Sequence, residues 1–150
     1  MTDLSVKKNL ANAMAIEFER DLEKDGLSPT EIQKRTARSR ERMISAPVVV
    51  ILNVDMSDMD VYPDEKRNQA EYLMAVQSVA NAGMQMLLAA HAEGLGSVWV
   101  CSPLFVQETI QNILELPKAW EPQAMFFVGY PQDIPEVRER KPLAEVVIRR

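Results

Sequence analysis

The residues of this chain whose types could do chemistry are few. One cysteine, Cys101, and one histidine, His91, are the only candidates for a nucleophile and its base. His91 falls in a stretch with helical spacing, and a free cysteine is commonly a small buried apolar residue. We therefore expect no cysteine nucleophile. One cysteine with one histidine also excludes a zinc site built on several cysteines.

Two further patterns lack residues that their chemistry needs. Gly94 and Gly96 follow an expected helix rather than a strand, and the third glycine of a dinucleotide-binding loop is missing. Four aspartates between Asp55 and Asp64 suggest calcium, but the mid-loop glycine and closing glutamate of a calcium loop are absent. We interpret this segment as a solvated loop and expect neither a catalytic residue nor a metal site. Such a chain is typical of proteins whose chemistry belongs to a bound cofactor.

Length and composition predict one globular domain that spans residues 1–150. The chain has 150 residues, 47% of them hydrophobic, and a net charge of −5. An acidic protein lacks the basic surface of a general nucleic-acid binder. Its longest apolar runs have seven residues, too short to span a bilayer, and its N-terminus lacks the pattern of a signal peptide. We expect a cytoplasmic protein without a membrane or nucleic-acid partner.

Apolar spacing and capping residues predict two N-terminal helices. The first covers residues 4–24 and ends before Gly26. The second begins after Ser28, with Pro29 in its first turn and Glu31 three residues after the cap, and continues to about Met43. This second helix is strongly basic. The sequence leaves open whether its positive side chains are a solvated face or bind a ligand.

Three strands and two further helices follow. The expected strands cover residues 46–54, 97–101 and 123–130, and the first is covered on both faces because it shows no alternation. A helix from Phe105 to about Leu114 begins near Ser102 and Pro103. The segment from Pro131 is a tail rich in proline and charge that ends in a short apolar run. This order of elements predicts an α+β fold, a mixed sheet flanked by helices.

The longest helix, residues 67–93, is apolar on most sides, with Gln77, Asn81 and Gln85 in one narrow polar stripe. A chain of this size does not supply enough cover to bury such a helix on every side. A subunit interface explains the pattern, and small residues along the helix allow close approach of a partner helix.

The sequence resembles the flavin-dependent nitroreductase family from about Lys7 to Val147. The motifs that carry the resemblance share its order and spacing: Ala89-Ala90-His91-Ala92-Glu93-Gly94-Leu95-Gly96-Ser97-Val98-Trp99, Ser102-Pro103-Leu104-Phe105, Leu116-Pro117, Trp120-Glu121-Pro122, Gly129-Tyr130-Pro131 and Arg138-x-Arg140-x-Pro142. Tyr62-Pro63-Asp64, Arg67 and Ala70-Glu71 are similar to the branch associated with deazaflavin coenzyme biosynthesis.

The resemblance implies a nitroreductase-like sandwich, a domain-swapped homodimer and FMN at the subunit interface. It also implies an oxidoreductase that moves a hydride from NAD(P)H, through flavin N5, to a nitro, quinone or enone-type acceptor. Carried over, it places four residues against the flavin ring, with the amides of the last two facing N5 and O4: Trp99, Val100, Cys101 and Ser102. It assigns Arg138 and Arg140 to the FMN phosphate, where the arginine fork suits the ligand, although a solvated tail remains the alternative.

The sequence departs from the family pattern at its N-terminus. The arginine-rich segment and the Ala-Pro-Ser-like segment with which family members begin, and which supply phosphate, ribityl and pyrimidine contacts, have no counterpart here. We therefore expect an N-terminally truncated domain that lacks part of the flavin site. The alternative function is a non-catalytic or weakly flavin-binding remnant that dimerises, or a ligand-binding module.

Overall fold

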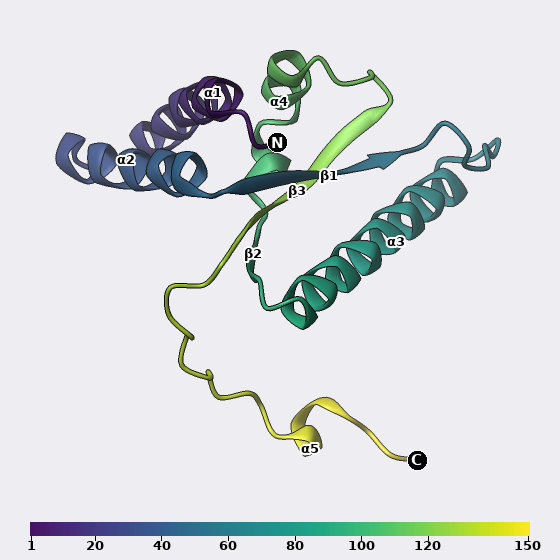
Figure 1. Cartoon of the computed structure of the whole chain (residues 1–150). Coiled ribbons are helices and arrows are strands. Elements are labelled where there is room, and N and C mark those ends of the chain that lie inside the picture. Colours follow the sequence, from purple (N-terminus) through teal and green to yellow (C-terminus); the bar gives the residue numbers. More distant parts are fainter.

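Two N-terminal helices precede a region in which strands and helices alternate. The computed structural model describes all 150 residues (Figure 1). Its elements, in chain order, are α1 (Leu4–Lys24), α2 (Pro29–Ser45), β1 (Val48–Asp55), α3 (Glu65–Ala92), β2 (Gly96–Val100), the 3-10 helix η1 (Ser102–Phe105), α4 (Gln107–Leu114), β3 (Trp120–Gly129) and α5 (Leu143–Val146).

Short polar side chains begin the three long helices. The Asp3 carboxylate accepts hydrogen bonds from the amides of Ser5 and Val6 and caps α1. Ser28 caps α2 as predicted, and Asp64 caps α3 by accepting from the Arg67 amide. Each cap satisfies an amide that has no partner within its helix.

The three strands form one sheet in the order β1-β3-β2. Both pairings are antiparallel, Val48 opposite Val128 and Gly96 opposite Gly129. The predicted α+β class, with helices flanking a sheet, is confirmed. The sheet of this chain is antiparallel at both pairings rather than mixed, because β1 and β2 run in the same direction but β3 lies between them.

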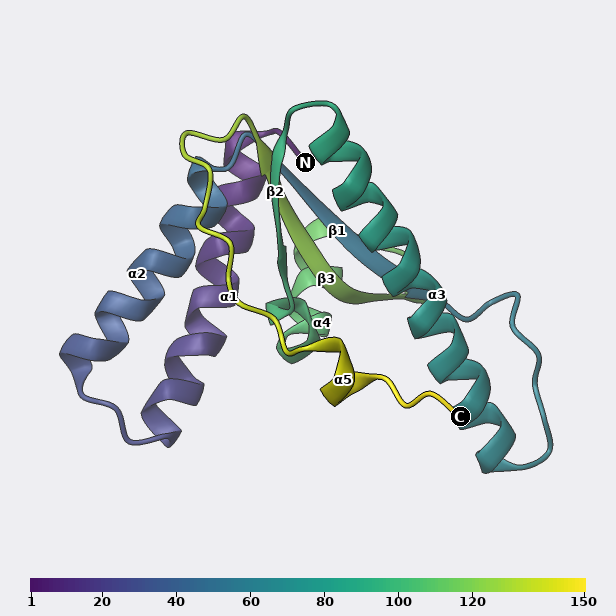
Figure 2. The same cartoon turned by 90° about the horizontal axis from the view of Figure 1, so that it is seen from below.

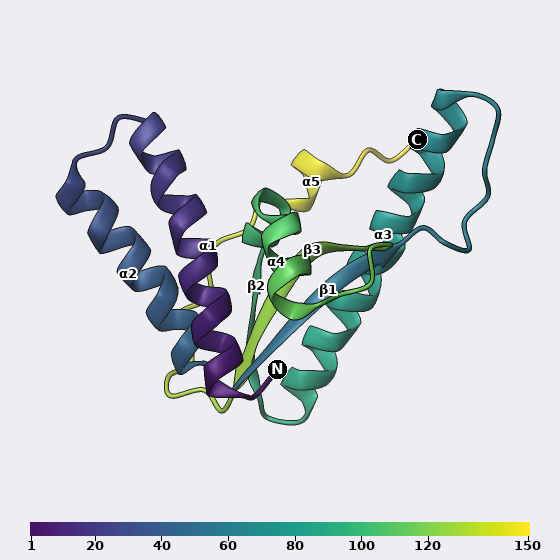
Figure 3. The same cartoon turned by 90° about the horizontal axis from the view of Figure 1, so that it is seen from above.

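Helices cover both faces of the sheet. In Figures 1 and 3, α1 and α4 lie over one face, α2 packs on α1, and α3 crosses the opposite face. One apolar cluster joins α1, α2 and α4 to the sheet: Leu10, Ala11, Met14, Met43, Ala46, Val49, Ile110 and Met125. A smaller one, Ala124, Phe126 and Val128, lies under α3. Alternate residues of β1 contribute to each cluster, as its unbroken apolar pattern predicted.

The predicted helix from Phe105 to Leu114 is divided, and Ser102 does not cap it. Ser102 is the first residue of η1, which has no side-chain cap, and α4 starts only at Gln107. Val106 separates the two helices because its backbone (φ −144°, ψ 37°) leaves the helical region. The chain thus makes a tight turn directly after β2 instead of entering a helix at once.

Much of α3 is exposed within the single chain. Only Glu71, Ala75 and Gly83 are buried, whereas Met84 and Leu88 are 52% and 61% exposed. This agrees with the prediction that the chain cannot bury this helix by itself. By length and composition alone α3 could cross a membrane, a test that core helices of water-soluble proteins also pass.

Gly83 is a point of close approach between α3 and the sheet. A Cβ built there would lie 2.7 Å from the Trp99 ring, 2.9 Å from the Phe126 ring and 3.0 Å from a Leu52 methyl. The two rings contact each other with centroids 4.9 Å apart. Because a ring cannot swing aside as a flexible chain end can, α3 can dock here only with glycine.

We predict that Gly83→Ala destabilises the protein by about 1–3 kcal/mol, the usual result of overpacking. Helix propensity alone predicts that the same substitution stabilises the protein, because alanine is favoured over glycine by about 1 kcal/mol within a helix. Thermal unfolding of the variant checks this. The control is Ala82→Gly at the exposed neighbouring position, which should lower stability only by the difference in helix propensity between alanine and glycine. A rise in Tm for Gly83→Ala would contradict the docking described above.

Candidate functional site

A cavity of about 410 Å³ lies between the α1–α2 hairpin and the turn that follows β2. Val100, Cys101 and Ser102 line it on the sheet side, and Phe105 of η1 adds an aromatic wall. The α1–α2 hairpin and the β2–η1 turn face each other in Figure 2. Apolar lining with a few polar groups is the usual character of a site for an organic ligand.

The turn after β2 brings the backbone of Cys101 and Ser102 to this cavity. Neither N–H is used in the backbone bonds of the turns and caps, and neither donates to a side chain. The carbonyl of Cys101 does accept a bond, from the amide of Leu104, which holds the tight turn in shape. The turn therefore carries two adjacent backbone donors in residues that line the cavity, and fixed backbone donors of this kind stabilise negative charge on a bound molecule.

Trp99 lies on the other side of the sheet from the cavity. Its ring packs on Phe126 beneath α3, because successive residues of a strand point to opposite faces. Its indole N–H donates to the Cys101 sulfur, 3.1 Å away, so this thiol lies beside the Trp99 ring while the backbone of Cys101 continues into the cavity wall. Of the four residues predicted beside the ring, the structure brings Val100, Cys101 and Ser102 to the cavity and leaves Trp99 behind them.

Arg138 and Arg140 do not line the cavity. Both lie in the irregular segment between β3 and α5 and are exposed. Figure 1 shows this segment running away from the sheet. No side-chain hydrogen bond or ion pair within the chain holds either guanidinium. The two arginines can therefore contact a phosphate, as predicted, only if another molecule holds the tail in position.

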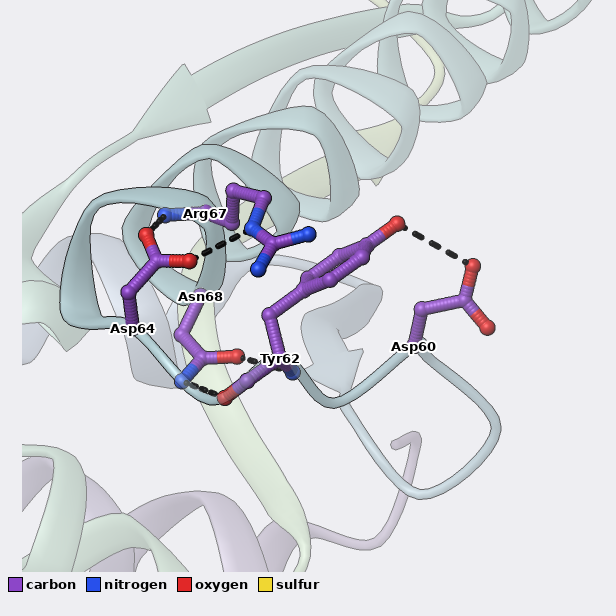
Figure 4. Close-up of polar contacts among 5 residues, drawn as sticks. All are labelled: Asp60, Tyr62, Asp64, Arg67 and Asn68. Carbon is purple, nitrogen blue, oxygen red and sulfur yellow. Dashed lines mark hydrogen bonds and ion pairs between the residues drawn. The ribbon is translucent and has the colours of Figure 1, made fainter.

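The loop before α3 is braced by a polar cluster, shown in Figure 4. The side-chain amide of Asn68 both accepts from the Tyr62 N–H (2.7 Å) and donates to the Tyr62 carbonyl (2.9 Å). The Arg67 guanidinium lies over the Tyr62 ring, 4.6 Å from its centroid, and pairs with Asp64. The nearby carboxylates of Asp60 and Glu71 raise the pKa of the Tyr62 hydroxyl, because a phenolate would face their negative charge.

This cluster contains residues on which the resemblance to the deazaflavin branch rests. In this chain Tyr62, Asp64 and Arg67 shape a loop and cap a helix, and none lines the cavity. Three of the four aspartates of the segment, Asp55, Asp60 and Asp64, accept hydrogen bonds within the protein; Asp55, for example, accepts from Ser57 and from the Trp120 indole.

Sequence reasoning missed the α1 wall of the cavity. Met14, Phe18, Leu22, Asp21 and Asp25 all line it. The signal in the sequence was weak, because apolar residues at helical spacing indicate a buried face and do not distinguish a core from a ligand cavity.

Comparison with known proteins gives consistent matches. A model described as "Nitroreductase family" matches residues 2–130. The oxygen-insensitive NADPH nitroreductase of Salmonella typhimurium (strain LT2) is 33% identical over 91 residues, which cover 60% of this chain and 38% of that protein. The chain therefore matches well under half the length of this relative.

Solved structures share the fold at low identity. A BluB-like flavoprotein from Clostridium difficile 630 superposes with a TM-score of 0.76 at 18% identity, over 99% of this chain and 76% of the other. Oxidized iodotyrosine deiodinase, bound to FMN and 3-iodo-L-tyrosine, gives a TM-score of 0.69 at 18% identity, over 99% and 72% of the two chains.

Proposed function

The chain belongs to the nitroreductase family, and we propose that it acts as an FMN-dependent oxidoreductase. In this proposal bound FMN would supply the redox chemistry for hydride transfer from NAD(P)H to a nitro, quinone or enone-type acceptor. The observation that carries the proposal is the β2–η1 turn, which brings Cys101 and Ser102, whose amides make no turn or cap hydrogen bond, to the wall of a largely apolar cavity.

The residues present suit a flat, electron-accepting ring. Met14, Phe18 and Val100 offer apolar surface to a planar molecule, and Phe105, 79% exposed in the chain alone, gains cover from a bound ring. The amides of Cys101 and Ser102 would donate to the ring edge where negative charge develops on reduction. In this role the side chain of Cys101 forms no covalent bond, and the backbone supplies the donor.

We predict that the backbone, not the thiol, of residue 101 matters for FMN binding. Cys101→Ala keeps the amide and should change the Kd for FMN by less than about twofold. Cys101→Pro removes a donor that no group in the chain uses, and should weaken binding by about three- to tenfold, the value of one hydrogen bond. Flavin fluorescence titration measures both, and thermal unfolding verifies that each variant is folded.

A second readout needs no turnover. Cys101 is the single cysteine and is exposed, so alkylation by iodoacetamide reports on this site alone. Saturating FMN should slow alkylation if the flavin lies in the cavity. Binding of FMN without protection would show that the bound cofactor leaves the Cys101 thiol uncovered, against its proposed place beside this residue. No binding at all would leave a non-catalytic module that dimerises.

We propose that Arg138 and Arg140 contact the FMN phosphate when the tail is positioned by a second copy of the chain. A double Arg138→Gln, Arg140→Gln variant should bind FMN about tenfold or more weakly, because a charge-assisted hydrogen bond is worth about 1.5–3 kcal/mol. Binding of riboflavin, which has no phosphate, should not change. Arg149→Gln and Arg150→Gln in the same tail serve as the charge-matched control.

We propose a homodimer that covers the exposed face of α3, since monomers rarely expose a large apolar surface. Met84→Lys or Val79→Lys should prevent assembly, because a buried unpaired charge is strongly unfavourable. Gln85→Lys, on the polar stripe, should not. Sedimentation velocity at micromolar concentration distinguishes these results. A wild-type monomer would contradict the proposal, as would partition of the protein into lipid vesicles through α3.

A further inference from the structure

A second hollow adjoins the cavity and is lined with arginines. It has a volume of about 370 Å³ and shares Phe18, Ser39 and Val100 with the cavity. Arg35, Arg38 and Arg42 of α2 line its remaining helical side. These positions are three and four residues apart, so they share one face of the helix. The floor is apolar and consists of Met125 and Phe127 of β3.

Two of the three guanidinium groups have no acidic partner. Arg35 pairs with Glu31 at 2.8 Å, whereas Arg38 and Arg42 take part in none of the four ion pairs of the chain. Arg42 instead lies over the Phe127 ring, 5.8 Å from its centroid, and this contact holds it against the hollow. Both groups can therefore pair with an anion without breaking an existing ion pair.

The location of these charges favours ligand binding over a merely solvated face. The protein carries a net charge of −5, yet α2 concentrates five positive side chains, Lys34, Arg35, Arg38, Arg40 and Arg42. Three of the five border a hollow beside the cavity, next to aromatic surface. Arginine binds carboxylate and phosphate groups in bidentate fashion, and apolar surroundings strengthen such pairs.

We infer that Arg38 and Arg42 bind the anionic group, a carboxylate or phosphate, of the electron acceptor whose reducible part occupies the adjoining cavity. This rests on the proposed function, and it narrows the acceptor to a planar organic anion. Arg38 and Arg42 are binding residues here and take no part in the redox step.

The test compares two acceptors, 4-nitrobenzoate and its neutral methyl ester, with the FMN-loaded protein; the ester keeps the nitroaromatic ring but removes the negative charge. We expect a lower KM and a lower Kd for the acid than for the ester. Arg38→Gln or Arg42→Gln should raise both constants for 4-nitrobenzoate about tenfold, the effect of one lost charged hydrogen bond, and leave those for the ester unchanged. Arg40→Gln, which does not line the hollow, is the matched control.

Other results would overturn the inference. Equal constants for acid and ester, or equal effects of Arg38→Gln on both, would show that the arginines do not read the charge of the acceptor. A loss of affinity confined to FMN relative to riboflavin would assign the arginines to the phosphate of the cofactor. A change confined to NADPH relative to NADH would assign them to the donor. Equilibrium dialysis measures the Kd of each acceptor without turnover. The inference can therefore be tested even if neither acceptor is reduced and the proposed function is wrong.

Discussion

The arrangement of this chain depends on one close approach, at Gly83, between a helix and a sheet. Because no Cβ intervenes, the Trp99 and Phe126 rings can lie directly against α3. This contact fixes which way β2 faces. With Trp99 turned toward the helix, the alternation of the strand turns Val100 toward the opposite side, where the cavity lies. Helix docking on one face of the sheet thus determines the lining of the site on the other.

The other wall of the cavity depends on how the α1–α2 hairpin is held. Lys7 is a buried residue of α1, and its ammonium donates to the carbonyls of Ala46, at 2.6 Å, and Ile44, at 3.3 Å. These carbonyls belong to the C-terminal end of α2, which lacks amide partners of its own. The Lys7 side chain, which comes from α1, therefore provides hydrogen bonds to carbonyls at the C-terminal end of α2. The hairpin that carries Phe18 and the arginines of α2 is anchored at this junction, beside β1.

The sequence predicted the elements better than their arrangement. Caps such as Ser28 and the positive-φ glycines Gly26 and Gly94 mark helix ends by local chemistry, so the boundaries of the long helices were accurate to about two residues. The break at Val106 was missed because Ser102-Pro103 resembles an ordinary helix start, and only the turn after β2 requires otherwise. Strand order could not be read from the sequence, since it depends on pairings between residues far apart.

For the candidate site, too, the sequence predicted some of the residues and missed others. Val100, Cys101 and Ser102 were found because a contiguous motif carries them, whereas Phe18 and Asp21 reach the cavity only through the packing of α1. The arginines of α2 were visible as a charge pattern, but a pattern does not say what a helix faces. Arg138 and Arg140 remain a prediction from the family, since nothing in the single chain holds them.

The central place of β3 also bears on how the chain acquires its structure. Both β1 and β2 pair with β3 and not with each other, although β3 is the last of the three to be synthesised. The α1–α2 hairpin can form early from local contacts, while β1 waits for a partner that lies beyond the long helix. Through that interval its aliphatic run Val48–Leu52 has exposed edges and is prone to aggregate. A nascent chain that ends before Trp120 has two strands and no sheet.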